Sequence, residues 1–409
     1  MELELNRGRQ VCLLLFFAII MFVIAMGSFF FVRFLFNYLY INRSNITDGA
    51  YEVALLDIDR NLVFGDIDTG KTQSLDIKVY SPDWSVKWSP NGQWLSTVST
   101  DNKLWIVNDT HTAKSQILPS PETDKISGME WSPTSSSLAF LPYSHSRSLG
   151  IWLYHMESGS YDVVLGTESY NCEENLAWSY DENWIICSTN TGKVLSIKID
   201  GSQVQEIFNN ANYPPWRVTT SPNSNYVVFQ VYDNAWELYV ADFTLPHAAM
   251  KIPKDYKSSI IFDGWSSGGM SVYASPYNNS GRLYEIDINS AEKVLISDDW
   301  GGAVLSPSRN KMNHFDVKEG VRELDLTSGR ISYFEMGDLQ NILKEESGDD
   351  CGTYWDKEYH VTDVLLCTYH RNLQTREVSV IHKSGRRTRI GNGLFDPHSF
   401  VYVKPTFRP

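Results

Sequence analysis

The string "DGWSSGG" at residues 263–269 places Gly264, Ser266 and Gly268 in the pattern G-x-S-x-G. In serine hydrolases this pattern forms the nucleophile elbow, a sharp turn that joins a strand directly to a helix and exposes the serine hydroxyl. The residues that follow, "GMSVYASPYNNSGRLYEIDI" (269–288), contain two glycines, a proline, Asn-Asn and strand-like alternation, so no helix fits there. His382 and His398 also fall in strand or loop segments. The sequence therefore predicts a turn between strands at Ser266 and no catalytic serine.

Other patterns that carry chemistry are weak. There is no phosphate-binding loop, no H-E-x-x-H motif and no histidine pair with metal-ligand spacing. Asp57, Asp59, Asp66 and Asp68 lie close together but lack the spacing of a calcium loop and its distal glutamate. The short basic run at 383–389 is typical of an exposed hairpin. We therefore predict neither a metal nor a cofactor.

The balance of charge argues against one class of partner. The chain carries 35 Lys and Arg against 49 Asp and Glu, a formal net charge of −14. Nucleic-acid binding needs a basic surface, so we expect no nucleic-acid partner. The sequons at Asn42, Asn45, Asn108 and Asn278 are about as many as chance supplies and carry no conclusion.

The first 50 residues differ from the rest. Residues 11–32, "VCLLLFFAIIMFVIAMGSFFFV", contain no charge and as a helix would span about 33 Å, enough to cross a bilayer core. We expect a short tail at 1–10, a transmembrane signal anchor at 11–32 and a juxtamembrane linker at 33–50. The expected orientation has the N-terminus in the cytoplasm and the C-terminal domain outside it. The alternative is a signal peptide cleaved near Ala25-Met26-Gly27.

After residue 50 one phrase recurs every 40 to 50 residues: an apolar strand, Trp-Ser-Pro or a relative of it, a polar turn and a second apolar strand. Its copies lie at 86–98, 129–141, 176–188, 218–230, 263–275, 303–315 and, in degenerate form, 353–367. A second phrase, an alternating strand followed by an acidic or glycine-bearing turn, interleaves with the first. We assign the Ser-Pro turn to the hairpin between the first and second strands of a four-stranded unit, and the other turn to the hairpin between the third and fourth. The tryptophan of the first phrase is expected to wedge each unit against its neighbour, and one helix is expected, at 337–347.

The W-S-P-[DN]-G phrase, with its strands in phase over residues 51 to about 405, resembles the repeats of TolB-like, WD-type β-propellers. The resemblance implies an all-β fold, a β-propeller at 51–409 made of four-stranded blades. The repeat spacing favours eight blades, with seven as the alternative. The lone C-terminal strand in 398–404 is expected to join the first blade and close the ring, which leaves no open sheet edge. The prolyl oligopeptidase family also combines a propeller with a similar serine motif, but this chain has no room for its α/β domain.

The cysteines fit the same units. Cys172 and Cys187 flank one Trp-Ser phrase, Cys351 and Cys367 flank another, and Cys12 lies in the apolar segment. Each flanking pair lies on two neighbouring strands, which predicts two disulfides and an oxidising, extracytoplasmic compartment. Four buried free thiols are the alternative.

In a propeller, the connections between blades and the loops between second and third strands gather around the central channel. The first group is rich in acidic and aromatic residues. The predicted ligand-binding residues there are Trp84, Glu174, Tyr213, Trp216, Asp298, Asp299, Trp300, Asp349 and Asp350. The loops at 143–150, 232–237 and 369–375 are equally good contact points. For Trp84 and Trp216 the alternative is packing against the neighbouring blade.

The function expected from this arrangement is non-enzymatic: a recognition or scaffold module that binds a protein, peptide or glycan through the propeller rim. The enzymatic alternative is a hydrolase or lyase at the channel mouth that uses paired carboxylates such as Asp298 and Asp349. A sensor or stalk subunit of an envelope complex is a third hypothesis.

Overall fold

A computed structural model of the chain forms two compact units, Met1–Ala50 and Tyr51–Pro409. The structure describes only residues of the second unit: 53–67, 69–79, 85–108, 114–117, 123–145, 147–210, 213–252, 259–277, 281–300, 304–305, 309–316, 320–333, 364–372, 375–382, 387–391, 395 and 402–403. The predicted anchor at 11–32, its flanking segments and the predicted helix at 337–347 lie outside these residues. Within them, no helix has the length and hydropathy needed to cross a membrane.

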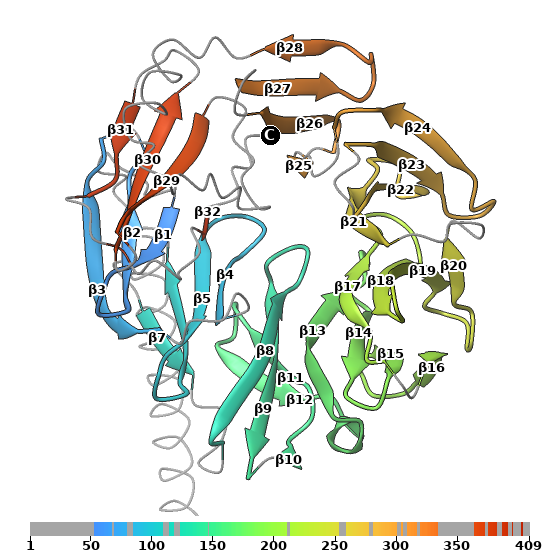
Figure 1. Cartoon of the computed structure of the whole chain (residues 1–409). Coiled ribbons are helices and arrows are strands. Elements are labelled where there is room, and N and C mark those ends of the chain that lie inside the picture. Colours follow the sequence, from blue (N-terminus) through green and yellow to red (C-terminus); the bar gives the residue numbers. More distant parts are fainter. Residues whose placement is uncertain are drawn as a thin grey trace, which may run out of the picture. The chain divides into compact units, whose positions relative to one another are not determined.

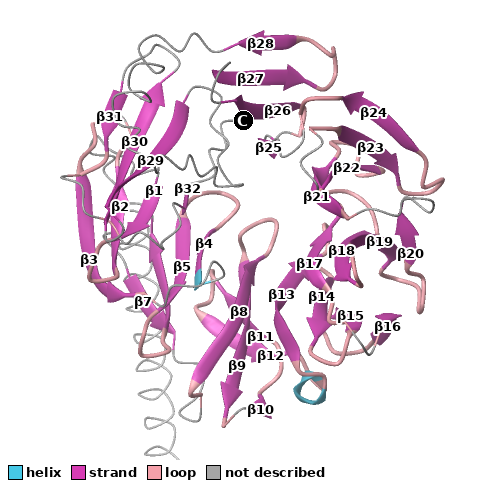
Figure 2. Ribbon diagram, in the orientation of Figure 1, coloured by secondary structure: helices cyan, strands magenta, loops and turns pink. Residues whose placement is uncertain are grey.

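The described residues form eight antiparallel sheets, which we number in chain order (Figure 1, Figure 2). Sheet 1 contains β1 (Val53–Leu56), β2 (Asn61–Gly65), β3 (Thr72–Lys78) and, from the end of the chain, β32 (Tyr402–Val403). Sheet 2 contains β4 (Val86–Trp88), β5 (Trp94–Val98), β6 (Leu104–Asn108) and β7 (Lys114–Ile117). Sheet 3 contains β8 (Lys125–Trp131), β9 (Ser137–Ser144), the short β10 (Arg147–Ser148), β11 (Trp152–His155) and β12 (Ser160–Val163). Sheet 4 follows a single 3₁₀ turn, η2 (Thr167–Ser169), and contains β13 (Cys172–Trp178), β14 (Trp184–Thr189), β15 (Lys193–Lys198) and β16 (Val204–Asn209).

The second half repeats this order. Sheet 5 contains β17 (Trp216–Thr220), β18 (Tyr226–Tyr232), β19 (Trp236–Asp242) and β20 (Met250–Ile252). Sheet 6 contains β21 (Ile260–Trp265), β22 (Ser271–Pro276), β23 (Leu283–Asp287) and β24 (Lys293–Ser297). Sheet 7 contains β25 (Val304–Leu305), β26 (Lys311–Asp316), β27 (Gly320–Asp325) and β28 (Ile331–Tyr333), and sheet 8 contains β29 (Val364–Asn372), β30 (Thr375–His382) and β31 (Arg387–Arg389). The described part of the chain is therefore all-β, as predicted.

The hairpins follow the repeat phrases of the sequence. In sheets 2 to 7 the Trp-Ser phrase, or its relative, joins the first strand to the second, and the strands on either side of it pair antiparallel. The second phrase, with its acidic or glycine-bearing turn, joins the third strand to the fourth in sheets 3 to 7. Both hairpin assignments are confirmed for these sheets. The degenerate seventh phrase begins outside the described residues.

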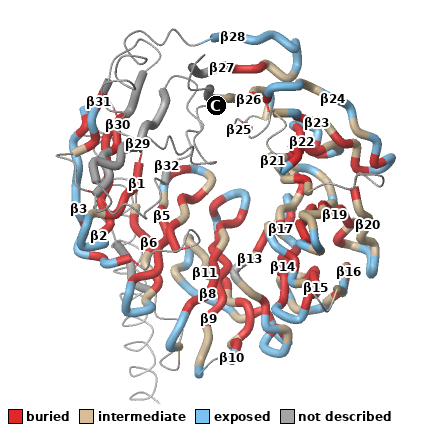
Figure 3. The backbone as a smooth tube through the Cα atoms, in the orientation of Figure 1, coloured by how far each residue is buried: buried red, intermediate tan, exposed pale blue. Residues whose placement is uncertain are grey.

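Buried residues lie along the strands of the sheets (Figure 3), and their apolar side chains form clusters between sheets. Each described cluster draws its side chains from two sheets, and together the clusters join sheet 8 to 1, 1 to 2, 2 to 3, 3 to 4, 4 to 5, 5 to 6 and 6 to 7. The apolar side chains of a strand point to both faces of its sheet, so each sheet needs a neighbour on either side to remove them from water. Packing sheets in chain order meets that need.

The tryptophans of the repeat link neighbouring sheets by hydrogen bonds as well as by packing. The indole Nε1 of Trp131 donates to the backbone carbonyl of Lys87 in sheet 2 at 3.2 Å. The indole of Trp178 donates to the carbonyl of Glu130 in sheet 3 at 3.0 Å. In sheet 5 a threonine stands in place of the tryptophan, and the hydroxyl of Thr220 donates to the carbonyl of Trp178. The expected role of these residues as wedges between sheets is confirmed at Trp131 and Trp178.

The two ends of the second unit meet in sheet 1. Ala54 of β1 is paired antiparallel with Tyr402 of β32, which confirms that the C-terminal strand joins the first sheet. Sheet 8 packs against sheet 1 from the other side, because Val378 and Ile390 share a cluster with β1 and β2. At this contact Gly70 has φ +71°, and a Cβ at this position would lie 2.1 Å from the carbonyl oxygen of Arg389. Only glycine combines that backbone conformation with that approach.

Cys172 of β13 and Cys187 of β14 are joined by a disulfide in this structure. Both side chains are buried in the cluster between sheets 3 and 4. The predicted partners Cys351 and Cys367 cannot be compared in the same way, because their side chains lie outside the described residues.

Candidate binding surface on the rim of sheets 5 and 6

Ser266 occupies a hairpin turn between β21 and β22 and is buried. Its hydroxyl accepts a hydrogen bond from the backbone N–H of Ser271 at 3.3 Å. The serines of the other Trp-Ser phrases do the same: the hydroxyls of Ser89, Ser132 and Ser179 accept from the backbone N–H five residues later at 3.0, 3.1 and 2.9 Å. The recurring serine thus accepts the first N–H of the second strand. A strand, not a helix, follows Ser266, so the geometry of a nucleophile elbow is excluded.

The rim is the end of each sheet at which the first strand begins, the second ends, the third begins and the fourth ends. Because neighbouring strands are antiparallel, these four strand ends lie at the same end of the sheet. The connection from one sheet to the next and the loop between second and third strands are therefore neighbours there. The opposite end carries the Trp-Ser turns.

Three aromatic side chains form a cluster on the rim of sheet 5. Trp216 begins β17, Tyr232 ends β18 and Trp236 begins β19. The rings of Trp216 and Trp236 are 5.2 Å apart at an interplanar angle of 32°, and those of Tyr232 and Trp236 are 5.2 Å apart at 61°. Trp216 is 48% exposed and Tyr232 is 50% exposed. The predicted ligand-binding residue Trp216 is therefore accessible to solvent.

The cluster continues onto sheet 6 through Ser259, the residue before β21. The backbone N–H of Trp236 donates to the hydroxyl of Ser259 at 2.9 Å. The carbonyl of Ser259 accepts from the N–H of Tyr277, which directly follows β22, at 2.9 Å. Tyr277 is 65% exposed. We call the four side chains Trp216, Tyr232, Trp236 and Tyr277 the aromatic rim cluster.

Arg217 contacts the ring of Trp216, a member of the aromatic rim cluster. Its guanidinium is 5.2 Å from the ring centre of Trp216, a cation–π contact. Burial lowers the pKa of Arg217, and the carboxylate of Asp263 partly offsets that effect. Arg217 has φ 50°, a left-handed conformation that is uncommon outside glycine, at an irregularity in the pairing of β17 with β18. Backbone of this kind is frequent at binding and catalytic sites.

The acidic part of the predicted site lies on the connection from sheet 6 to sheet 7. Asp298 is exposed and pairs with Arg282, with Oδ1 3.5 Å from Nε. Asp299 Oδ2 accepts from Arg322 Nη1 at 2.6 Å. The hydroxyl of Ser297 and the guanidinium of Arg322 together lower the pKa of Asp299.

Trp300, which follows these two aspartates, is fully buried. It lies in the cluster between sheets 6 and 7, with the guanidinium of Arg322 5.3 Å from its ring centre. Its side chain therefore contributes to packing rather than to the rim surface. Alternate residues of an extended segment point into the core, and the sequence alone did not indicate whether Trp300 is one of them.

The remaining predicted residues are not part of the aromatic rim cluster. Tyr213 is half-buried and packs against the core between sheets 4 and 5. Glu174 lies in β13, but its side chain is outside the described residues. Trp84, Asp349 and Asp350 also lie outside them. Within the described part of the chain, no group of three or more His, Cys, Asp and Glu residues could hold a metal ion.

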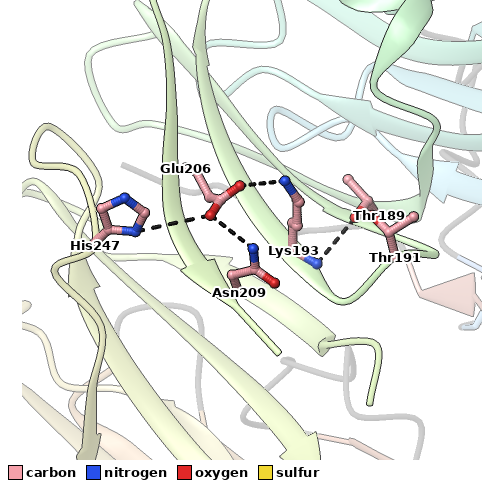
Figure 4. A network of polar contacts seen from close by, with 6 residues as sticks. All are labelled: Thr189, Thr191, Lys193, Glu206, Asn209 and His247. Atoms are coloured by element: carbon pink, nitrogen blue, oxygen red, sulfur yellow. Dashed lines mark hydrogen bonds and ion pairs between the residues drawn. The ribbon is translucent and has the colours of Figure 1, made fainter. Parts of the chain in front are cut away.

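A network of polar contacts joins sheet 4 to sheet 5 (Figure 4). Glu206 of β16 accepts from Lys193 Nζ at 2.5 Å and from Asn209 Nδ2 at 2.9 Å, and its backbone carbonyl accepts from the N–H of His247 at 2.9 Å. Lys193 is tied in turn to the rim turn of sheet 4, because its N–H donates to the hydroxyl of Thr189 at 3.1 Å. The bonds from Lys193 and Asn209 lower the pKa of Glu206, so the carboxylate stays charged at neutral pH.

A shallow hollow of about 460 Å³ lies on sheet 4, lined by Asn183, Trp184, Lys198, Ile199 and Asp200. The ammonium of Lys198 lies 5.4 Å from the centre of the Trp184 ring. These residues belong to the hairpin turns opposite the rim, so the hollow is separate from the aromatic rim cluster.

Comparison with known proteins shows similarity in fold only. No family model and no curated protein sequence matches the chain. Solved structures that resemble it include the tricorn protease, at 10% identity and a TM-score of 0.51, over 84% of this chain and 38% of that one. Oligogalacturonate lyase from Vibrio parahaemolyticus is similar at 11% identity and a TM-score of 0.49, over 83% and 100% of the two chains. TolB from Acinetobacter baumannii is similar at 14% identity and a TM-score of 0.37, over 69% and 78%. The neighbours are of the β-propeller type, and they do not distinguish a binding protein from an enzyme.

Proposed function

We propose that this chain is a membrane-anchored β-propeller that binds a protein partner outside the cytoplasm through the aromatic rim cluster. The observation that carries the proposal is the exposure of aromatic side chains on adjoining sheets at the rim. Exposed tryptophan and tyrosine are the residue types that contribute most to protein interfaces. Exposed aromatic side chains that gather in one place, unlike apolar residues scattered singly over a surface, are typical of interaction sites.

The proposed propeller has eight blades. Eight described sheets, hydrophobic clusters that follow chain order from sheet 8 through sheet 1 to sheet 7, and the pairing of β32 with β1 support that number. Closure of this kind completes the first blade with four strands and leaves only the short, protected edges typical of propellers.

The proposed location rests on two features far apart in the sequence. Residues 11–32 have the length and composition of a transmembrane anchor. The disulfide between Cys172 and Cys187 is of a kind that persists in oxidising compartments and is rare in the cytosol. An anchor with the N-terminus in the cytoplasm would place the domain that carries the disulfide outside the cytoplasm, where disulfides persist.

The enzymatic alternative pairs Asp298 with Asp349, and Asp349 lies outside the described residues, so the case for it depends on the carboxylates around Asp298. A hydrolase or lyase that uses paired carboxylates needs one carboxyl group to be protonated at working pH. Asp299 has the opposite shift, since its pKa is lowered by Ser297 and Arg322, and Asp298 pairs with Arg282. We therefore propose binding rather than catalysis.

Site-specific photo-crosslinking tests the proposal. A photoreactive phenylalanine analogue replaces Tyr232 on the rim or, as the control, Tyr180, which is 43% exposed in the Trp-Ser turn of sheet 4. The full chain is then irradiated in cells. We expect a discrete protein adduct from position 232 and none from 180, and the purified partner should bind Trp236→Ala at least tenfold more weakly than the parent chain. Equal adducts from both positions, or unchanged affinity of the variant, would refute the proposal.

A further inference from the structure

We propose that the aromatic rim cluster recognises an extended, proline-rich segment of the partner that carries basic residues. This inference rests on the proposed function and specifies the chemistry of the segment that the rim binds. Three properties of the cluster support it: the way its rings cover one another, its hydrogen-bond donors and the charge around it.

The ring arrangement leaves the exposed parts of Trp216 and Tyr232 for small apolar groups and offers no single broad face on which a flat ligand could stack. One contact of Trp216 is with the guanidinium of Arg217 and another is with the tilted ring of Trp236. Trp236 in turn meets Tyr232 nearly edge to face. A sugar ring needs a broad open aromatic face, and the central rings of this cluster are already in contact with others. Pyrrolidine rings and aliphatic side chains are small enough to pack against the exposed parts of such tilted rings, as they do in domains that bind proline-rich peptides.

The hydrogen-bond donors of the cluster match a peptide backbone whose carbonyl oxygens are available as acceptors. The indole N–H groups of Trp216 and Trp236 and the hydroxyls of Tyr232 and Tyr277 have no hydrogen-bond partner within the described part of the chain. A polyproline II segment forms no internal hydrogen bonds, so all of its carbonyl oxygens can accept from outside. Proline residues contribute carbonyls but no N–H groups, which suits a surface that presents mainly donors. The segment is also extended before it binds, so less conformational entropy is lost on binding.

Carboxylates near the cluster favour basic residues in the bound segment. Asp233 directly follows Tyr232 in the rim loop, and its Oδ1 accepts only from the neighbouring Asn234, at 3.0 Å, among the contacts described. Asp298 is exposed on the connection that leaves sheet 6, close to Gly281, since a Cβ on Gly281 would lie 2.9 Å from the carbonyl of Asp298, and the carboxylate of Asp298 pairs with Arg282. The net charge of −14 adds a general attraction for cations. Arginine or lysine beside the prolines would meet the carboxylate of Asp233.

The test uses the purified full chain in detergent micelles and a fluorescent peptide of about 12 residues, which spans about 37 Å as polyproline II. The peptide carries repeated Pro-Pro-x-Pro units and arginines at both ends. One control peptide replaces every proline with alanine, a second replaces every arginine with glutamate, and an unlabelled oligosaccharide of glucose serves as a competitor. Binding is measured by fluorescence anisotropy at two salt concentrations.

We expect the parent peptide to bind at least tenfold more tightly than the alanine control, and more tightly than the glutamate control at low salt. Trp236→Ala should weaken binding at least tenfold. Tyr232→Phe and Tyr277→Phe keep the rings and remove only the donors, and each should weaken it about threefold. Tyr180→Phe, on the opposite end of the sheets, should have no effect.

The result separates this inference from the proposed function. Equal binding of the proline and alanine peptides, or displacement by the oligosaccharide, would overturn the inference. If the crosslinked partner still depended on Trp236 in that case, the rim would remain a protein-binding surface with a different preference. If neither the peptide nor the partner responded to Trp236→Ala, both proposals would fall.

Discussion

Replacing Ser179 with alanine tests why a serine recurs after each tryptophan of the repeat. Ser179 is fully buried, and its hydroxyl accepts from the N–H of Trp184 at 2.9 Å and donates to Asp181 Oδ1 at 2.5 Å. Ser266 has the same position in sheet 6 but only a single bond, at 3.3 Å, to the N–H of Ser271. The two substitutions remove the same atom from equivalent turns, so they form a matched pair.

The expected cost follows from these bonds. A hydrogen bond between neutral groups contributes about 1 kcal/mol, and one to a charged group about 1.5 to 3 kcal/mol, with the lower end fitting Asp181 because its carboxylate is largely exposed. Ser179→Ala should therefore lower the free energy of unfolding by about 2.5 kcal/mol, and Ser266→Ala by about 1 kcal/mol or less. With an unfolding entropy near 2.1 cal/mol/K per residue over roughly 360 residues, the melting temperatures should fall by about 3 °C and 1 °C.

Differential scanning fluorimetry on the purified full chain measures both shifts. A second readout treats the parent chain with a fluorophosphonate probe, which labels activated serines. We expect no label at Ser266, because the serine lies in a hairpin turn and donates to no base among the described residues. A larger shift for Ser266→Ala than for Ser179→Ala would refute the role given to the serine, and labelling of Ser266 would refute the assignment of its turn.

Three further predictions concern closure, the disulfide and charge. Gly70→Ala should lower the melting temperature by several degrees and raise hydrogen exchange around Arg389, because a Cβ would meet that residue's carbonyl; unchanged exchange there would contradict the contact. Cys187→Ser removes a disulfide whose sequence separation is 15, and should cost about 3 kcal/mol; peptide mapping without reductant should find Cys172 linked to Cys187 in the parent chain, and free thiols at both would contradict it. Asp299 has a lowered pKa, so its charge stabilises the fold above the ordinary aspartate pKa of about 3.9, and this contribution is lost as the pH falls through the lower folded value. The difference in stability between the parent chain and Asp299→Asn should therefore be present at pH 6 and shrink below about pH 4, and a difference that grows on acidification would contradict it.

The repeat made the hairpins predictable, because each type of turn has its own chemistry. Ser-Pro with a polar follower presets the turn between first and second strands, and an acidic or glycine-bearing turn marks the third and fourth. Even the pairing of Tyr402 with β1 followed from the sequence, since a lone C-terminal strand and a first unit without a Ser-Pro turn complete one sheet. These inferences need only local residue types and their spacing.

The candidate surface was harder to predict, because it depends on which way a side chain points and on what its neighbours cover. Trp216 and Trp300 have similar positions at entries to first strands, yet one is half exposed and the other fully buried. The loop at 232–237 could be named from its composition as a contact point. The contribution of Tyr277 to the surface could not be predicted in this way. It depends on Ser259, which contacts two sheets through its own backbone and hydroxyl. Nothing in the spacing of the sequence indicates such a bridge.

The pairing of β32 with β1 has a consequence for how the chain is made. During synthesis β1 leaves the ribosome long before β32, because the other described strands lie between them in the sequence, so one edge of β1 has no native partner until β32 is made. Until that point a nascent chain carries an open edge, and such edges invite pairing with other extended strands. A truncation that removes Tyr402 and Val403 would therefore leave this edge of β1 permanently available for pairing with other chains.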